Sequence, residues 1–181
     1  DISQDAVAAA SHDGHSVGIG SVLSLPFQDD AFELVISLDV LQHMPLDGGD
    51  LTAAREFRRV MKAGAILLIR TNAQSFPRVP EDHAEMYRRY DPHDLRATLE
   101  GAGLEILRMS RANSVLGFAE IPRELKARMA KKGSYYGLLS KPSAGLLDST
   151  KRRILELEGK LIARGVSLPF GRALFALCRR T

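Results

Sequence analysis

The sequence contains a single cysteine, Cys178, among its 181 residues. One thiol cannot form an internal disulfide or supply the thiolate set of a structural zinc site, so we expect no metal and a cytoplasmic location. Long hydrophobic stretches are missing as well. The longest purely apolar run is the six residues Ala173–Cys178, whereas a bilayer-spanning helix needs about 20. Nothing in the sequence resembles a signal peptide.

Net charge is also small, at +3, which gives only weak support for a nucleic-acid partner. With 45% hydrophobic and 26% charged residues, the composition fits one globular domain and excludes collagen-like, coiled-coil and disordered chains. The charge is unevenly placed. Residues 1–100 hold 9 basic and 16 acidic side chains, and residues 101–181 hold 16 basic and 6 acidic ones. The two parts of the chain should therefore face different partners.

Short apolar runs alternate with helical patterns, which predicts an α/β fold with a parallel sheet. The expected strands are Val17–Ile19, Leu34–Ser37, Ala65–Thr71, Leu104–Met109 and Ala173–Cys178.

Two helices are expected between these strands. Residues 50–61 carry Leu51, Ala54, Phe57 and Met61 on one face and stop at 62–64, and a second helix follows Asp91 as N-cap, with Pro92 at its first position.

A long connection separates the last two strands. Its roughly 60 residues far exceed the dozen that a crossover needs, so residues 113–165 are predicted to be a helical insertion. Residues 1–112 and 166–181 would form the core domain. Within the insertion, residues 150–164 show the spacing of an amphipathic helix.

Four ordered motifs resemble class I S-adenosylmethionine-dependent methyltransferases, in the branch with an LPF turn before the fourth strand. They are Leu25-Pro26-Phe27 followed by Phe32-Glu33-Leu34-Val35, then Val40-Leu41-Gln42-His43, then residues 56–65, and then residues 90–103. The resemblance implies a Rossmann-like, three-layer αβα fold with S-adenosyl-L-methionine as cofactor.

The family's glycine-rich cofactor loop has no counterpart here, because Gly18-Ile19-Gly20 leads into the LPF turn and not into a helix. We therefore expect a methyltransferase sheet without its first strands, truncated at the N-terminus and inactive as this fragment alone.

By the same resemblance, Asp1 and Ile2 lie where the family binds the cofactor ribose, and Ser21 and Val22 where it binds adenine. Backbone of Ser37, Leu38 and Asp39 would lie beside the methionine part, and Asp39 could alternatively cap the next helix. His43 is either a general base or a brace for its loop.

Tyr87, Arg89 and Tyr90 are expected either to contact an anionic acceptor or to begin a solvated helix with a tyrosine anchor. The basic insertion, with apolar residues such as Leu116, Phe118, Tyr135 and Tyr136, suits a lid, a peripheral membrane contact or a homodimer contact. Nucleic acid is disfavoured, since base-stacking aromatics are sparse there.

The sequence thus predicts methyl transfer to a small-molecule or lipid-like acceptor. The alternative is a non-catalytic binding protein that retains the fold.

Overall fold

The computed structural model describes residues 2–74, 88–114 and 146–181. Four strands form one sheet in the order β1-β2-β4-β3: β1 (Phe32–Leu38), β2 (Met61–Asn72), β3 (Leu104–Ala112) and β4 (Ala173–Arg180). Strand β1 runs parallel to β2, and β4 is antiparallel to both of its neighbours. The helices are α1 (Gln4–His12), the 3-10 turn η1 (Leu41–His43), α2 (Gly49–Val60), α3 (Pro92–Gly101) and α6 (Leu146–Ala163).

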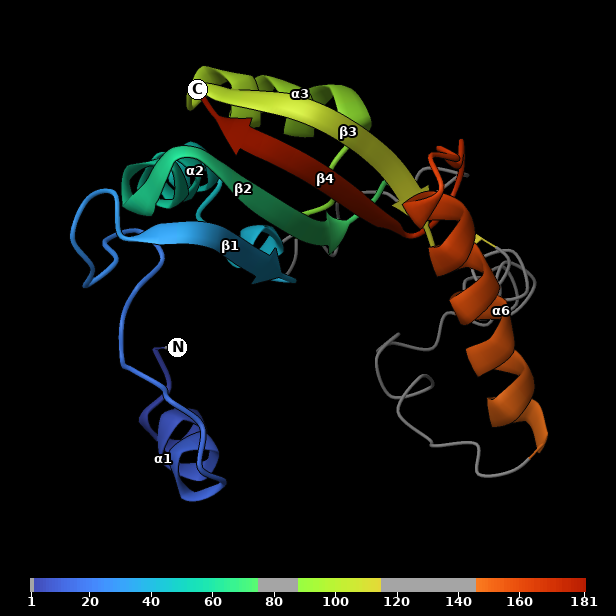
Figure 1. Cartoon of the computed structure of the whole chain (residues 1–181), viewed down its shortest axis with the longest axis horizontal. Helices are drawn as coiled ribbons and strands as arrows, with labels where there is room; N and C mark the ends of the chain where they lie inside the picture. Colours follow the sequence, from blue (N-terminus) through green and yellow to red (C-terminus); the bar gives the residue numbers. More distant parts are fainter. Residues whose placement is uncertain (1, 75–87, 115–145) are drawn as a thin grey trace, which may run out of the picture.

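Alternation along the strands shows which face of the sheet is packed. On β2, Leu67 and Ile69 are fully buried, whereas Ile66 and Leu68, which alternate with them, are half-buried. The buried set continues across the sheet into β4 and meets Phe57 of α2 and the leucines of α3. A strand projects successive side chains to opposite faces, so one face carries the core under α2 and α3 (Figure 1).

The opposite face is much less covered by the residues that the structure describes. On the edge strand β1, Leu34, Ile36 and Leu38 are each more than 50% exposed. Helix α1, which has no buried residue, stands away from the sheet in Figure 1.

Four of the five expected strands are confirmed, and Val17–Ile19 is not a strand. Val17 and Ile19 are exposed, and nearby only the bridge between Ser21 and Ser24 forms. An extended segment needs a neighbour for its backbone hydrogen bonds, and this segment lies beside no strand of the described sheet.

The helix predictions hold with small shifts. Asp91 caps α3 by accepting from the His93 N–H at 3.0 Å, and Pro92 is its first residue. Helix α2 ends at Val60, one residue early, and the expected stop at 62–64 is already part of β2. Met61 is therefore buried as the first residue of a strand and not as the last turn of a helix.

A charged clasp joins the turn at residues 25–29 to the end of α2. Arg59 Nε donates to Glu56 Oε1 at 2.8 Å, and Arg59 Nη1 donates to Asp29 Oδ1 at 2.7 Å. The same guanidinium donates to the carbonyls of Leu25 and Phe27, and Glu56 Oε2 accepts the Leu25 N–H at 2.7 Å. The backbone continues the contact, because Ala31 N–H donates to Val60 O at 2.9 Å. We call this set the Arg59 clasp.

The clasp makes stability depend on pH through Glu56. The Arg59 guanidinium, opposed by burial and helped by the Leu25 N–H, lowers the pKa of Glu56. Its contribution is therefore fully present above the unfolded pKa, about 4.3, and is lost as pH falls through the lower folded value.

We expect Glu56→Gln to reduce the free energy of unfolding at pH 7 by about 1 kcal/mol and to flatten its decline below the unfolded carboxyl pKa. Urea unfolding at pH 7 and in acid measures both effects. Glu100→Gln, which removes an exposed carboxylate paired with Arg96, is the matched control. Equal losses in the two variants would contradict a specific role for the clasp.

Candidate functional site

Strands β1 and β2 are parallel, so their carboxyl ends meet at one edge of the sheet, the edge where open α/β sheets collect ligands. Asp39 follows β1 there, with its N–H donating to Arg70 O of β2 at 2.9 Å. Its carboxylate pairs with the Arg70 guanidinium. Asp39 adopts a left-handed backbone, φ 57°, which aspartate tolerates better than most residues. The pair holds the chain in this bend.

The alternative role of Asp39 as a helix cap is not realised. The residue before η1 is Val40, and no side chain caps that turn.

Unpartnered polar atoms lie at this edge. Asp39 Oδ1 and Ser37 Oγ are buried and have no hydrogen-bond partner among the described residues, although buried polar atoms are normally paired. A carboxylate oxygen and a hydroxyl in this state suit a ligand that brings N–H or O–H donors. The predicted segment 37–39 is therefore chemically fit to hold one.

The turn η1 sits directly beside this edge. Gln42 is buried, its side-chain Oε1 accepts from Asn72 N–H at 3.1 Å, and its carbonyl accepts from Arg88 N–H at 2.8 Å. These contacts fix the turn between the end of β2 and the segment before α3. His43, the next residue, is exposed. The structure thus places His43 at the surface, on a turn that is itself braced by Gln42.

A buried network lies under the same turn and centres on Asp50 of α2, which is 5% exposed. Its Oδ2 accepts from Tyr90 Oη at 3.2 Å and from Thr98 Oγ1 at 3.3 Å, and Arg88 Nη1 lies 2.5 Å away. Tyr90 Oη also lies 3.2 Å from the Leu41 carbonyl. Burial and the adjacent Asp50 carboxylate raise the pKa of the Tyr90 phenol, so it remains a donor at neutral pH. The network ties η1 to α2 and α3.

The three residues predicted to contact an acceptor differ in their placement. Tyr90 is 2% exposed, so its ring lies in the core as an anchor and not at the surface. Arg89 is half-buried beside it, and Tyr87 lies outside the described residues.

The residues predicted to bind the nucleoside part are only partly described by the structure. Asp1 lies outside the described residues, and Ile2 is 74% exposed next to α1. Ser21 Oγ accepts from Leu23 N–H at 3.2 Å in a local turn, and Val22 packs against the core.

The insertion begins at the same end of the sheet. Ser114, just past β3, donates its N–H to Glu158 Oε1 of α6 at 3.1 Å and its hydroxyl to the Phe170 carbonyl at 2.6 Å. Glu158 is 6% exposed. A buried carboxylate therefore fixes α6 beside the carboxyl edge. Residues 115–145, with the apolar positions noted in the sequence, are not described.

Sequence reasoning missed Asp50, Gln42, Arg70 and Glu158. Asp50 marks only the start of a helix in the sequence pattern. A charged residue that begins the apolar face of a helix is itself a sign of a buried polar contact. The described residues contain no cluster of His, Cys, Asp and Glu arranged to hold a metal, and none of the described helices has the length and apolar character needed to cross a bilayer.

We expect Asp50→Asn to lower the free energy of unfolding by about 1–3 kcal/mol, because Arg88 loses its counter-charge in the interior. Urea unfolding at pH 7 measures the effect. Asp47→Asn, at an exposed position of the same loop, should change it little. A loss no greater than that of the control would contradict the network's role in bracing η1.

Comparison with known proteins agrees with this geometry. The family model described as Methyltransferase domain matches residues 1–69, a range that includes β1, η1, α2 and much of β2. No curated protein sequence matches the chain significantly.

Several solved structures share the fold. The (4+2) cyclase SpnF is 21% identical, with a TM-score of 0.56 over 99% of this chain and 63% of that one. An S-adenosylmethionine-dependent methyltransferase from Mesorhizobium loti is 14% identical, with a TM-score of 0.59 over 99% of this chain and 78% of that one. A SAM-dependent methyltransferase from Thermotoga maritima is 12% identical, with a TM-score of 0.59 over 100% of this chain and 72% of that one.

The chain thus spans less than two thirds of the length of SpnF, and one fold here serves both a cyclase and methyltransferases. The sequence match and the structural likeness nevertheless converge. The model described as Methyltransferase domain matches the first 69 residues, and the chain shares the α/β, Rossmann-like fold of the solved S-adenosylmethionine-dependent methyltransferases.

Proposed function

We propose that the protein carrying this chain transfers a methyl group from S-adenosyl-L-methionine to a small-molecule or lipid-like acceptor. The observation that supports the proposal most is the carboxyl edge of β1 and β2. There, buried atoms of Ser37 and Asp39 lack partners among the described residues, and the surrounding backbone is fixed by Arg70.

In this proposal the segment 37–39 holds the methionine part of the cofactor, Asp1 and Ile2 hold the ribose, and Ser21 and Val22 hold the adenine. When bound, the cofactor supplies an electrophilic methyl group on a sulfonium. The chain's residues then mainly orient the acceptor and exclude water. Arg70 holds the Asp39 carboxylate through Oδ2, and Oδ1, which has no partner among the described residues, can accept a hydrogen bond from a ligand N–H or O–H.

His43 is the candidate to take a proton from an acceptor O–H or N–H. Its exposure allows an acceptor to approach, and a neutral imidazole has a ring nitrogen that can accept a proton. Its turn is held by Gln42 and Tyr90, so these two residues position the imidazole and do not themselves contact the acceptor in this account.

The insertion is proposed as a cover for this edge. The carboxylate of Glu158, bonded to Ser114, supports that role over a homodimer contact or a peripheral membrane contact of a cytoplasmic protein, since it fixes α6 where the acceptor must enter. The exposed Leu157 and Leu161 of α6 would then face an apolar part of the acceptor, in keeping with a lipid-like molecule.

Calorimetry of the natural-length protein with S-adenosyl-L-methionine tests the proposal. We expect binding, and we expect Asp1→Asn to weaken it by about 1–3 kcal/mol through loss of charge-assisted hydrogen bonds to the ribose. Asp5→Asn, which removes a carboxylate from the exposed first turn of α1, should leave the affinity unchanged. The absence of any cofactor binding to the intact protein would sink the proposal.

A further inference from the structure

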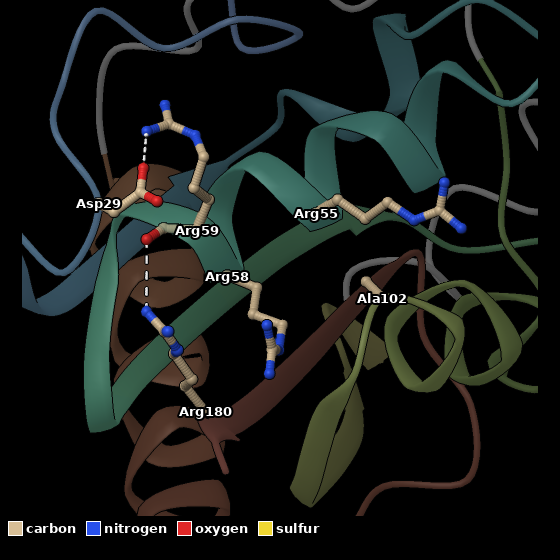
Figure 2. Close-up of a pocket in the computed structure, with 6 residues that line it drawn as sticks. All are labelled: Asp29, Arg55, Arg58, Arg59, Ala102 and Arg180. Carbon is tan, nitrogen blue, oxygen red and sulfur yellow. Dashed lines mark hydrogen bonds and ion pairs between the residues drawn. The ribbon is translucent and has the colours of Figure 1, made fainter.

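A second concentration of functional groups lies at the opposite end of the sheet, around the starts of β1 and β2 and the end of β4. A hollow of about 180 Å³ opens there, and it is lined by residues from the turn at 25–29, from α2, from the end of α3 and from β4. The lining residues are Asp29, Arg55, Arg58, Arg59, Ala102 and Arg180 (Figure 2). We call this hollow the arginine pocket.

Two of its arginines are fixed by carboxylates. Arg59 belongs to the clasp, with Asp29 Oδ1 at 2.7 Å. Arg180 pairs with Asp30 and donates to the Met61 carbonyl. Figure 2 shows the Arg180 guanidinium reaching up toward the Arg59 backbone. These two side chains form a wall of set geometry, and the one carboxylate that lines the pocket is already neutralised.

The other two arginines differ. Among the described residues, neither Arg55 nor Arg58 has a carboxylate partner. Arg58 is held by one bond, from its Nε to the Gly103 carbonyl at 3.1 Å. Gly103 has φ +78°, and a Cβ there would lie 3.0 Å from that Nε. Glycine at this position therefore suits both the backbone conformation and the close contact with Arg58. The two terminal nitrogens of Arg58 remain available, and Figure 2 shows its guanidinium in the space between Arg180 and Ala102.

The arrangement is electrostatically unfavourable without a counter-ion. Arg58 and Arg180 approach one another across the hollow, where like charges repel, whereas the Arg55 guanidinium extends away from them (Figure 2). The negative end of the α2 dipole favours cations near Arg58 and Arg59. It does not explain why the guanidinium of Arg58 is seated toward Arg180 of another element. An anion in the hollow would relieve this repulsion.

The chemistry favours a phosphate group. A guanidinium presents a planar fork of donors that matches phosphate and carboxylate oxygens. A carboxylate is planar and is satisfied by one or two forks from its own plane. A tetrahedral phosphate presents oxygens in several directions. The arginines here approach from α2 on one side and from β4 on the other, so their N–H donors can meet oxygens that point in different directions.

We propose that the arginine pocket binds a phosphate group, either as inorganic phosphate or as the terminal phosphate of a small ester. The pocket lies at the amino ends of the parallel strands, away from the edge that carries Asp39 and His43. It is therefore a site separate from methyl transfer, and this inference stands whether or not the proposed function is correct.

Calorimetry at constant ionic strength, with inorganic phosphate, glycerol 3-phosphate and glycerol as separate titrants, tests the site. We expect the protein to bind inorganic phosphate and glycerol 3-phosphate but not glycerol. The double variant Arg55→Gln/Arg58→Gln should weaken phosphate binding at least tenfold. Glycerol 3-phosphate bound more tightly than inorganic phosphate would identify an ester as the source, and equal affinities would identify the free anion.

The matched control is Arg152→Gln/Arg153→Gln. It also removes two positive charges, from exposed positions on α6, and should change the affinity for phosphate less than twofold. Arg59 is left intact because it belongs to the clasp, and urea unfolding of both variants verifies that they fold. The single variant Arg58→Gln should cause most of the weakening of phosphate binding that the double variant causes. No phosphate binding by the unaltered protein, equal weakening in the two double variants, or glycerol binding as tight as glycerol 3-phosphate would overturn the proposal.

Discussion

The guanidinium of Arg59 is the interaction on which the described fold most depends. It binds the Glu56 carboxylate three residues back, and it reaches across to the turn at 25–29, where it meets two backbone carbonyls and Asp29. Because Glu56 also accepts the Leu25 N–H, the turn and the helix end are bonded in both directions. The chain then enters β1 beside Val60 and the start of β2. The clasp thus sets where β1 begins and, through the parallel pairing, where it ends.

That register has a consequence at each end of the sheet. At the carboxyl end it brings Asp39 next to Arg70, with η1 held above the Asp50 network. At the amino end it brings Arg59 next to Arg180, which closes one side of the arginine pocket. The sheet therefore separates a polar edge suited to a donor-bearing ligand from a basic hollow suited to an anion. The net charge of +3 conveys neither feature. Among the described residues, Arg59, Arg70 and Arg180 are paired with carboxylates, whereas Arg58 is bonded to a backbone carbonyl.

Local rules were sufficient for much of this architecture. Asp91 and Pro92 fixed the start of α3, and the apolar runs at β1 to β4 were legible as strands because each is bounded by turns and rich in branched residues. The LPF turn and the Glu56-x-x-Arg59 spacing were recognised as motifs, yet their meaning as a single clasp needed the structure. A hydrogen bond between residues 25 and 59 leaves no periodic trace in the sequence.

Other features depended on long-range packing. Val17–Ile19 has strand composition but lies beside no strand of the described sheet, so composition alone gave the wrong answer. The sequence left Tyr90 as either a contact to an acceptor or an anchor, and only its contact with Asp50, 40 residues earlier, shows it to be the anchor. The pairing of Glu158 with Ser114 spans 44 residues and could not be read from either segment.

We propose that residues 37–39, at the carboxyl edge of β1, hold the methionine part of the cofactor. Backbone amide chemical shifts of the natural-length protein, recorded during titration with S-adenosyl-L-methionine, test it residue by residue. The account predicts the largest changes at Ser37, Leu38 and Asp39, with a smaller response at Arg70, and none at Arg55 or Arg58. Shifts confined to the arginine pocket or to α6, or no shift at residues 37–39 at saturating cofactor, would contradict it.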